Sequence, residues 1–451
     1  MSIISKNSDG SITVSEARGL NGEVRVPGDK SISHRAVILG AITDGITTVG
    51  NFLSGEDNLS TLNAFKQMGV AAEIGTDKAS LSYNFLTIHG RGQGRLAEPE
   101  DVIDVGNSGT TARLLTGLLS AQPFFSVITG DASLRKRPMR RVVEPLRLMG
   151  AQINGRNDSK LLPLAIKGGS LQGKEYKTPI ASAQLKSALL LAGLFADGET
   201  IVEEPALSRD HTERMLKAFG ADIKVDGLRT TVTSKNKLKG DYELLVPCDI
   251  SSAAFFMVGA MITSESDLFL RNVGVNPTRT GIIDILKKMG GFNSINVLNE
   301  REDCGEPVAD ICVKRSSLNG VDISGPELLP AIDEFPIICI AAAFAYGRTT
   351  IIGAGELRVK ESDRIAVMAN SLRAVGIVCE EKEDGIVIDG RGGYQARRIK
   401  GGTIDSLGDH RIAMAFAIAG LRATDGITIK NPDCATVSFP GFYDLLEKIS
   451  Q

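Results

Sequence analysis

Residues 26–35 read VPGDKSISHR and lead straight into an apolar segment at residues 36–42. The Pro-Gly pair favours a turn, Asp29 or Ser31 can cap a helix, and good helix formers follow. The stretch therefore predicts a strand, a tight loop and the start of a helix.

The start of this expected helix carries two cations, Lys30 and Arg35. Free backbone N–H groups attract anions at such an end, whereas positive side chains are unfavourable there unless an anion lies between them. We favour an anion-binding site as the interpretation. A solvated basic helix start is the alternative.

The same pattern returns at residues 246–251, VPCDIS, again before an apolar segment but without the Lys and the Arg. Because 451 residues exceed one ordinary hydrophobic core, two domains are expected. We interpret both stretches as crossings between them, near residues 26–29 and 246–249. The predicted domains are residues 27–246, and residues 1–26 plus 247–451.

A helix-like run that ends in an apolar residue, a glycine and a strand-like run recurs five times along the chain. The glycines stand roughly 70 to 86 residues apart, at Gly69, Gly150, Gly220, Gly290 and Gly376. Each can adopt the left-handed conformation that ends a helix. With a last helix near residues 445–449, the repetition predicts six α+β units, three in each domain.

The composition is that of a globular protein, with 42% hydrophobic and 23% charged residues. The longest apolar runs, near residues 188–196 and 253–262, are too short to span a membrane, and residues 1–10 lack the apolar core of a signal peptide. A net charge of −3 argues against nucleic acid as a general partner.

Six cysteines include no CxxC pair. We interpret them as reduced, buried, small hydrophobic residues of a cytosolic protein, with metal ligation as the alternative. They are Cys248, Cys304, Cys312, Cys339, Cys379 and Cys434.

The motif at residues 26–35 resembles the opening substrate-binding motif of the 5-enolpyruvylshikimate-3-phosphate (EPSP) synthase family, in its class II bacterial branch. The resemblance implies an α/β fold, the inside-out α/β barrel, with two domains of three repeated α+β units each. It also implies that the two domains close over the substrates. It implies transfer of the enolpyruvyl group of phosphoenolpyruvate to the 5-hydroxyl of shikimate 3-phosphate, in aromatic amino-acid biosynthesis. It also implies a cytoplasmic monomer without metal or cofactor, and a glyphosate target.

Residues 104–113, DVGNSGTTAR, resemble the second motif of the family, although by themselves they also suit a plain connector. The resemblance implies that the backbone at Gly109 borders the phosphoenolpyruvate site. Some tolerant class II enzymes carry alanine there, which crowds glyphosate. Glyphosate tolerance by that route is not expected in this chain.

Residues 135–141 hold five cations. The resemblance implies that Arg137 binds phosphoenolpyruvate, and the other four are expected to be surface charge. The segments SAQLK and RDHTE, at residues 182–186 and 209–213, resemble those that separate class II from class I. They imply that shikimate 3-phosphate is held by Ser182, Gln184 and Arg209.

Two alternatives remain for these segments. Ser182 has an adequate role as a helix cap without any ligand. His211 is expected to be packed or capping rather than catalytic.

In the second half, Asp333 precedes an apolar run, where a carboxylate also suits an N-cap. The segment LRVKESDR, residues 357–364, is the most specific short signature. On a helix, Lys360 and Arg364 share a face. The resemblance makes Asp333 the base near the 5-hydroxyl and Glu361 the group that protonates phosphoenolpyruvate C3, and it makes Arg411 a further phosphoenolpyruvate ligand.

The implied site therefore has three parts. The catalytic residues are Lys30, Asp333 and Glu361. The shikimate 3-phosphate ligands are Lys30, Ser31, Arg35, Ser182, Gln184, Arg209, Asp333 and Lys360. The phosphoenolpyruvate ligands are Lys30, Gly109, Arg137, Gln184, Arg364 and Arg411.

The substrates bring about six negative charges. Seven cations of the implied site balance them, namely Lys30, Arg35, Arg137, Arg209, Lys360, Arg364 and Arg411. Val437 stands where class I members have a lysine, and Arg209 is a candidate to compensate.

Two rivals are weighed against this interpretation. UDP-N-acetylglucosamine enolpyruvyl transferases have Asn beside the first Lys and a mobile-loop Cys, whereas here Ser31 follows Lys30 and residues 100–140 contain no Cys. A non-catalytic, anion-binding descendant is expected to have lost Lys30, Asp333 or Glu361, and all three are present.

Overall fold

The computed structural model describes residues 2–76, 84–392 and 398–450, and the chain divides into two units by its internal contacts. Unit 1 comprises Met1–Pro27, Cys248–Arg301 and Pro307–Gln451. Unit 2 comprises Gly28–Pro247 and Glu302–Glu306. Each unit contains its own cluster of buried hydrophobic side chains.

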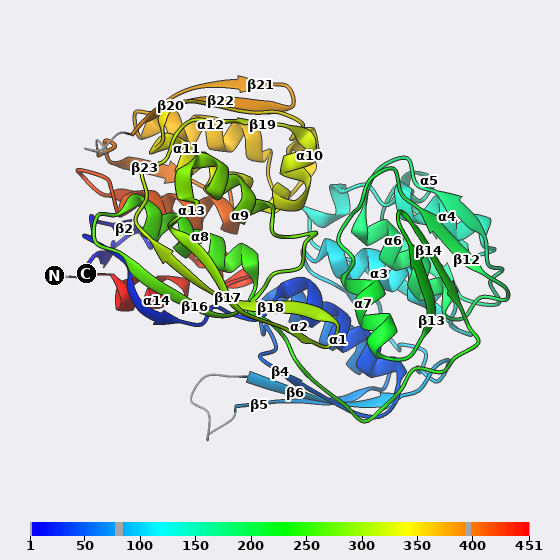
Figure 1. Ribbon diagram of the computed structural model, residues 1–451. Coiled ribbons are helices and arrows are strands. Elements are labelled where there is room, and N and C mark those ends of the chain that lie inside the picture. The colour runs from blue at the N-terminus through cyan, green and yellow to red at the C-terminus, as the bar shows by residue number, and fades with distance from the viewer. Residues whose placement is uncertain (1, 77–83, 393–397, 451) are drawn as a thin grey trace. The chain divides into compact units, whose positions relative to one another are not determined.

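Three helices in each unit are apolar on nearly every side, and almost all of their residues are buried. A helix that is hydrophobic all round needs packing partners all round. These helices therefore form the interior of each unit, with the sheets outside them (Figure 1). They are α1 (Lys30–Ile42), α3 (Gly109–Ser120) and α6 (Ala183–Gly193) in unit 2, and α8 (Ile250–Ile262), α11 (Phe335–Ala343) and α13 (His410–Gly420) in unit 1.

In the part of the chain that the structure describes, the strands form six four-stranded sheets, three in each unit, and every sheet contains one parallel pair at an edge. In unit 2 the orders are β15 (Tyr242–Leu245), β4 (Asp44–Gly50), β6 (Asn84–Arg91), β5 (Ala71–Thr76); β7 (Ile103–Asp104), β8 (Phe125–Thr129), β10 (Leu161–Lys167), β9 (Gln152–Gly155); and β11 (Glu175–Lys177), β12 (Thr200–Glu203), β14 (Arg229–Thr233), β13 (Asp222–Asp226).

In unit 1 the orders are β3 (Asn21–Val24), β16 (Asp267–Gly274), β18 (Glu306–Lys314), β17 (Ile295–Asp303); β19 (Asp322–Ile323), β20 (Tyr346–Ile351), β22 (Gly385–Arg391), β21 (Val378–Lys382); and β23 (Gly402–Asp405), β24 (Ile427–Lys430), β2 (Ile12–Val14), β1 (Ile4–Lys6). The same arrangement therefore recurs six times, as the repeated sequence pattern predicts.

In each unit one sheet is completed by a single edge strand that comes from far along the chain, and in unit 1 the N-terminal strands β1 and β2 also join β24 in another sheet. In unit 2, β15 lies parallel to β4, with Leu245 opposite Gly50. In unit 1, β3 lies parallel to β16, with Val24 opposite Leu270. Both completing strands end just before a point where the chain passes from one unit to the other.

Five of the six outer helices that the structure describes end where the repeated glycines predict, and the sixth, α14 (Phe442–Ile449), is the last helix of the chain. The other five are α2 (Glu56–Gln67), α4 (Arg140–Leu148), α7 (His211–Ala218), α9 (Gly281–Leu286), which continues into a π-helical turn (Lys287–Gly291), and α12 (Arg364–Ala374). The five glycines have φ values of 81°, 102°, 82°, 115° and 80°, which side-chain-bearing residues rarely adopt. The predicted helix ends are confirmed.

All six cysteines are free thiols, but only Cys248 and Cys339 are buried. The expectation that all six are buried is wrong for the other four. Cys304, Cys312 and Cys379 lie on or beside strands with one half-exposed face, and Cys434 lies in the 3-10 helix η5 (Pro432–Val437). Within the described residues, no helix is long and apolar enough to cross a membrane.

Candidate functional site

The loop before α1 forms as predicted. The carboxylate of Asp29 caps the helix by accepting the backbone N–H of Ile32 at 2.9 Å. Lys30, the first helical residue, forms an ion pair with Asp57 in the first turn of α2. The anion beside Lys30 in this structure is therefore a carboxylate of the protein itself, which the sequence pattern did not indicate.

Arg35 lies one turn further along α1 and is buried. Its Nε donates to Thr212 Oγ1 at 2.6 Å, its Nη2 to Ser187 Oγ at 2.8 Å and its Nη1 to the Ser31 carbonyl at 2.9 Å. Burial lowers the pKa of Arg35 to about 10, with nearby Arg209 adding to the effect. Arg35 still carries its charge at neutral pH.

Gly109 begins α3, which Ser108 caps. A Cβ atom at Gly109 would lie 2.8 Å from Arg113 Nη1 and 3.4 Å from Arg137 Nη1. Arg137 also donates to the side chain of Asn107 at 2.8 Å. The loop therefore brings two guanidinium groups against a backbone position that has no side chain.

Gln184 lies in the first turn of α6 and joins this loop to its neighbours. Its Oε1 accepts Arg113 Nη1 at 2.9 Å and Arg141 Nη2 at 3.4 Å, and its Nε2 donates to Thr110 Oγ1 at 3.1 Å. The expectation that Arg141 is surface charge is wrong, because α4 turns this side chain toward Gln184. Arg135, Lys136 and Arg140 are exposed as expected.

Ser182 and Arg209 precede α6 and α7. The Ser182 hydroxyl accepts the Leu185 N–H at 3.4 Å, so the serine cap is present. Arg209 is half-buried, directly before the N-cap residue Asp210. His211 is buried against Glu306, with 2.8 Å between Nδ1 and Oε1, which confirms its packed role.

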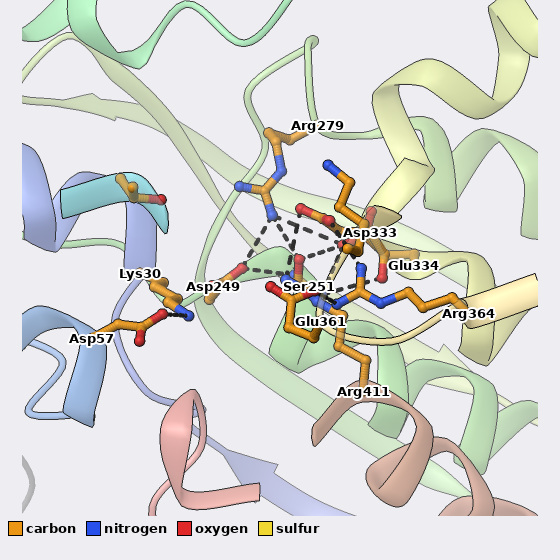
Figure 2. A network of polar contacts seen from close by, with 12 residues as sticks. Lys30, Asp57, Asp249, Ser251, Arg279, Asp333, Glu334, Glu361, Arg364 and Arg411 are labelled. Atoms are coloured by element: carbon orange, nitrogen blue, oxygen red, sulfur yellow. Dashed lines mark hydrogen bonds and ion pairs between the residues drawn. The ribbon is translucent and has the colours of Figure 1, made fainter. Parts of the chain in front are cut away.

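In unit 1, Asp333 lies in the short 3-10 helix η3 (Leu329–Glu334), and it is Glu334 that occupies the N-cap position of α11. The Asp333 carboxylate lies 3.5 Å from Arg364 Nη1 and 3.7 Å from Arg411 Nη2. Figure 2 shows these three side chains together. Asp333 is thus held by two arginines that come from later helices.

Arg364 is the first residue of α12, and its buried guanidinium gathers carboxylates. Nη2 lies 2.6 Å from Glu361 Oε2 and Nε lies 2.8 Å from Asp409 Oδ2. Burial by itself lowers the pKa of Arg364. The carboxylates of Asp409, Glu361 and Asp333 outweigh this effect and raise the pKa above its usual range.

The expected helical pairing of Lys360 with Arg364 is wrong. Asp363 caps α12, and Lys360 ends the preceding 3-10 helix η4 (Gly355–Val359) in a non-helical conformation. Since Asp363 is a strong N-cap, the helix begins four residues later than the pattern suggested. Lys360 instead contacts Glu356 at 3.1 Å.

Behind Asp333 lies a buried polar cluster that sequence reasoning missed (Figure 2). Ser251, at the start of α8, donates to Glu334 and accepts Arg279 Nη2 at 2.7 Å. Arg279 Nη2 also lies 3.3 Å from Asp249 Oδ1, and Arg411 Nη1 lies 3.8 Å from Glu334 Oε1. This cluster supports the backbone next to Asp333.

These contacts correct the charge balance expected from the sequence. Arg364 and Arg411 face carboxylates of the chain itself, and so does Lys30. The guanidinium groups of Arg364 and Arg411 are therefore already partly neutralised by carboxylates of the chain. Counting cations in a sequence overestimates the positive charge because buried charges recruit partners.

Sequence reasoning also missed Asp57 and Arg113. Arg113 left a signal, since a charged residue inside the apolar run 112–119 is expected only where it finds polar partners. Asp57 left none. The described residues contain no group of three or more metal-ligating side chains.

The comparisons with known proteins agree with one another. A family model described as EPSP synthase (3-phosphoshikimate 1-carboxyvinyltransferase) matches residues 14–446. The 3-phosphoshikimate 1-carboxyvinyltransferases of Geobacter metallireducens and Geobacter sulfurreducens are 56% and 54% identical to the chain, each over 98% of it and 99% of the relative. A solved EPSP synthase from Acinetobacter baumannii superposes with a TM-score of 0.86 at 50% identity, over 98% of both chains.

Proposed function

The chain belongs to the EPSP synthase family, and from that membership we propose that it transfers the enolpyruvyl group of phosphoenolpyruvate to the 5-hydroxyl of shikimate 3-phosphate. The products are 5-enolpyruvylshikimate 3-phosphate and inorganic phosphate. This is a step of aromatic amino-acid biosynthesis.

The reaction runs by addition and elimination. The 5-hydroxyl oxygen attacks C2 of phosphoenolpyruvate while C3 gains a proton, which gives a tetrahedral intermediate with a methyl group. That methyl group then loses a proton as the bond from C2 to the phosphate oxygen breaks. Each half needs one proton donor and one proton acceptor near the reacting carbons.

The observation that carries the proposal is the meeting of Asp333 and Glu361 on Arg364, at 3.5 and 2.6 Å. Two carboxylates from separate segments of unit 1 are thereby oriented by one guanidinium. We assign the hydroxyl proton to Asp333 and the proton exchange at C3 to Glu361. Lys30 assists at the bridging oxygen or the departing phosphate.

The ligands that we propose for the two anionic substrates are those that the family resemblance implies. For shikimate 3-phosphate we propose Lys30, Ser31, Arg35, Ser182, Gln184, Arg209, Asp333 and Lys360. For phosphoenolpyruvate we propose Lys30, Gly109, Arg137, Gln184, Arg364 and Arg411. Arginine suits this task because its planar fork binds phosphate and carboxylate through two parallel hydrogen bonds.

The test is release of inorganic phosphate from phosphoenolpyruvate and shikimate 3-phosphate by the wild type, Glu361→Gln and Glu380→Gln. Glu380, an exposed carboxylate paired with Lys382, is the matched control. We expect release only with both substrates, a loss of about 10²- to 10⁴-fold in Glu361→Gln and an unchanged control.

A parallel reaction offers UDP-N-acetylglucosamine as the acceptor. Release with that acceptor alone, or no release by the folded wild type, rejects the proposed reaction. Equal activity of the two variants rejects the role of Glu361 while leaving the reaction standing.

We also propose that the two domains are residues 27–246 and residues 1–26 plus 247–451, with hinge crossings near residues 26–29 and 246–249. Unit 2 differs from the first of these domains by one residue at each end and by the added segment Glu302–Glu306. Support comes from the separate hydrophobic core of each unit.

We further propose that the protein is a cytoplasmic monomer. Support for the cytoplasmic location comes from the six free thiols. Light scattering during gel filtration tests the monomer, since a mass near twice 47.9 kDa contradicts it.

A further inference from the structure

Unit 2 contains a buried charged triad that the proposed mechanism does not use. Lys186 Nζ, on α6, lies 2.6 Å from Glu204 Oε2 and 2.6 Å from Glu213 Oε1. The three side chains are 2%, 2% and 5% exposed. We call these residues the Lys186 triad.

A second set of contacts lies beside the triad, one residue after Lys186 on α6 and one residue before Glu213 on α7. Ser187 Oγ on α6 and Thr212 Oγ1 on α7 lie 2.6 Å apart, and both accept hydrogen bonds from Arg35 of α1. Residues 186–187 thus meet residues 212–213 through paired polar contacts. The starts of α6 and α7 are joined to each other and to Arg35.

The Lys186 triad reaches the proposed substrate ligands through short paths. The Ser182 backbone N–H donates to Glu204 Oε1 at 3.1 Å, so the triad holds the N-cap residue of α6. Gln184 lies two residues before Lys186 on the same helix. Arg209 lies four residues before Glu213, at the entry to α7.

Burying this triad is expensive. One ammonium and two carboxylates lose their hydration, and replacing buried ion pairs by apolar side chains is often neutral or stabilising. Glu213 Oε2 also has no hydrogen-bond partner among the described residues. Stability alone is therefore a weak reason for the triad.

We propose that Lys186 is a positioning residue for shikimate 3-phosphate. By holding Glu204 and Glu213 together, it sets the starts of α6 and α7 so that Ser182, Gln184 and Arg209 stand in register for one anionic ligand. This inference rests on the proposed function and concerns the binding of that substrate alone.

The first measurement is the Kd of shikimate 3-phosphate without phosphoenolpyruvate, by titration calorimetry at about pH 8. Lys186→Met is expected to raise Kd roughly tenfold, which is about 1.4 kcal/mol. Glu213→Gln keeps the shape and an acceptor for Lys186, so we expect less than about a threefold rise. Lys177→Met is the matched control. Lys177, on β11, forms an exposed pair at 3.2 Å with Glu203 on β12, the residue directly before Glu204 of the triad.

A pH series separates positioning from simple packing. Without Lys186, two carboxylates face each other, and burial already raises the pKa of Glu213 in the intact protein. A proton then replaces the ammonium as pH falls, and the affinity of Lys186→Met relative to wild type recovers between about pH 8 and pH 6. Lys186→Met/Glu213→Gln lacks this carboxylate pair, so its ratio to wild type stays constant with pH.

Charged groups from several elements surround Glu213. They are Lys186 on α6, Glu204 after β12, Arg35 on α1, and Asp210 before α7, with His211 and Glu306 beside them. His211 and the phosphate of the ligand are the same in all variants, so the ratio to wild type removes their contribution.

The outcomes divide clearly. A raised Kd that recovers at low pH only in Lys186→Met supports the proposal. A Lys186→Met protein with lower thermal stability but wild-type Kd at both pH values overturns the proposal. If Lys186→Met does not fold, a wild-type Kd for Lys186→Met/Glu213→Gln overturns the proposal instead. A wild type that binds no shikimate 3-phosphate instead rejects the proposed function.

Discussion

Arg364 and Asp409 form a buried ion pair in unit 1, with 2.8 Å between Nε and Oδ2. The other oxygen of Asp409 accepts the backbone N–H of Arg411 at 3.0 Å. One carboxylate thus orients Arg364 on α12 and caps α13, the helix that carries Arg411. The pair stands directly behind the carboxylates proposed for proton transfer.

Replacing Asp409 by Asn is expected to lower the free energy of unfolding by about 2–3 kcal/mol. Asparagine caps a helix as well as aspartate does, so the change removes the charge and keeps the cap. Asp333 and Glu361 remain near Arg364, which keeps the loss below that of a completely broken buried pair. We also expect the KM for phosphoenolpyruvate to rise at least about tenfold.

Urea unfolding and steady-state kinetics check this prediction. Asp363→Asn is the stability control, because Asp363 also caps a helix and pairs with an arginine but is 38% exposed. Its loss is expected to stay below about 1 kcal/mol. Equal losses in the two variants contradict the importance of burial at Asp409.

Gly109→Ala is expected to weaken glyphosate inhibition. The new methyl group meets Arg113 Nη1 at 2.8 Å, so the guanidinium must shift, and Arg113 is hydrogen-bonded to Gln184. The wild type, which keeps Gly109, is expected to be sensitive. The glyphosate inhibition constant should rise roughly tenfold and the KM for phosphoenolpyruvate severalfold.

Inhibition titrations at fixed phosphoenolpyruvate measure both effects. Gly106→Ala is not a matched control, because Gly106 has a φ of 56° and strains any side chain. Gly169→Ala is suitable, since a Cβ there meets nothing within 4 Å. A wild type that is already tolerant contradicts the expectation.

Asp57→Asn tests the carboxylate that pairs with Lys30. The variant keeps a polar partner of the same shape but removes a negative charge near the proposed anion ligands. We expect kcat to fall about tenfold because Lys30 is less firmly oriented, whereas the Kd of shikimate 3-phosphate does not increase. A large rise in Kd with unchanged kcat contradicts this division.

Glu327→Gln tests a pH-dependent contribution to stability. Lys288, at 2.6 Å, and then Ser324 lower the pKa of Glu327 to about 2 from an ordinary value of 4.5. A carboxylate with a depressed pKa stabilises the folded state above its unfolded pKa, and this contribution is lost as pH falls from about 4.5 through 2. Glu327 forms the capping box of α10 (Gly325–Leu328), which leads into η3 and Asp333.

The measurement is the difference in unfolding free energy between wild type and Glu327→Gln at pH 6 and pH 3. Because the side chain is 41% exposed, we expect a difference below about 1 kcal/mol at pH 6 and a smaller one at pH 3. A difference that is independent of pH contradicts the depressed pKa.

Much of the fold could be predicted from local pattern. The left-handed glycines that end the outer helices and the cap at Asp29 follow from backbone sterics and hydrogen bonding within a few residues. The motifs around Lys30, Gly109 and Arg364 carried the family resemblance, which the comparisons confirm.

The tertiary structure alone decided the partners of the charges. Ion pairs join residues that are far apart in sequence at Asp57, at Asp409 and in the Lys186 triad. Lys360 lies outside the expected helix because Asp363 caps α12 and the helix begins only at Arg364. A buried charge must find an opposite charge wherever the fold supplies one, since desolvation costs far more than any local preference. The sequence motifs, through the family that they resemble, therefore determined which groups are proposed for the chemistry, and packing determined how each of them is held and neutralised.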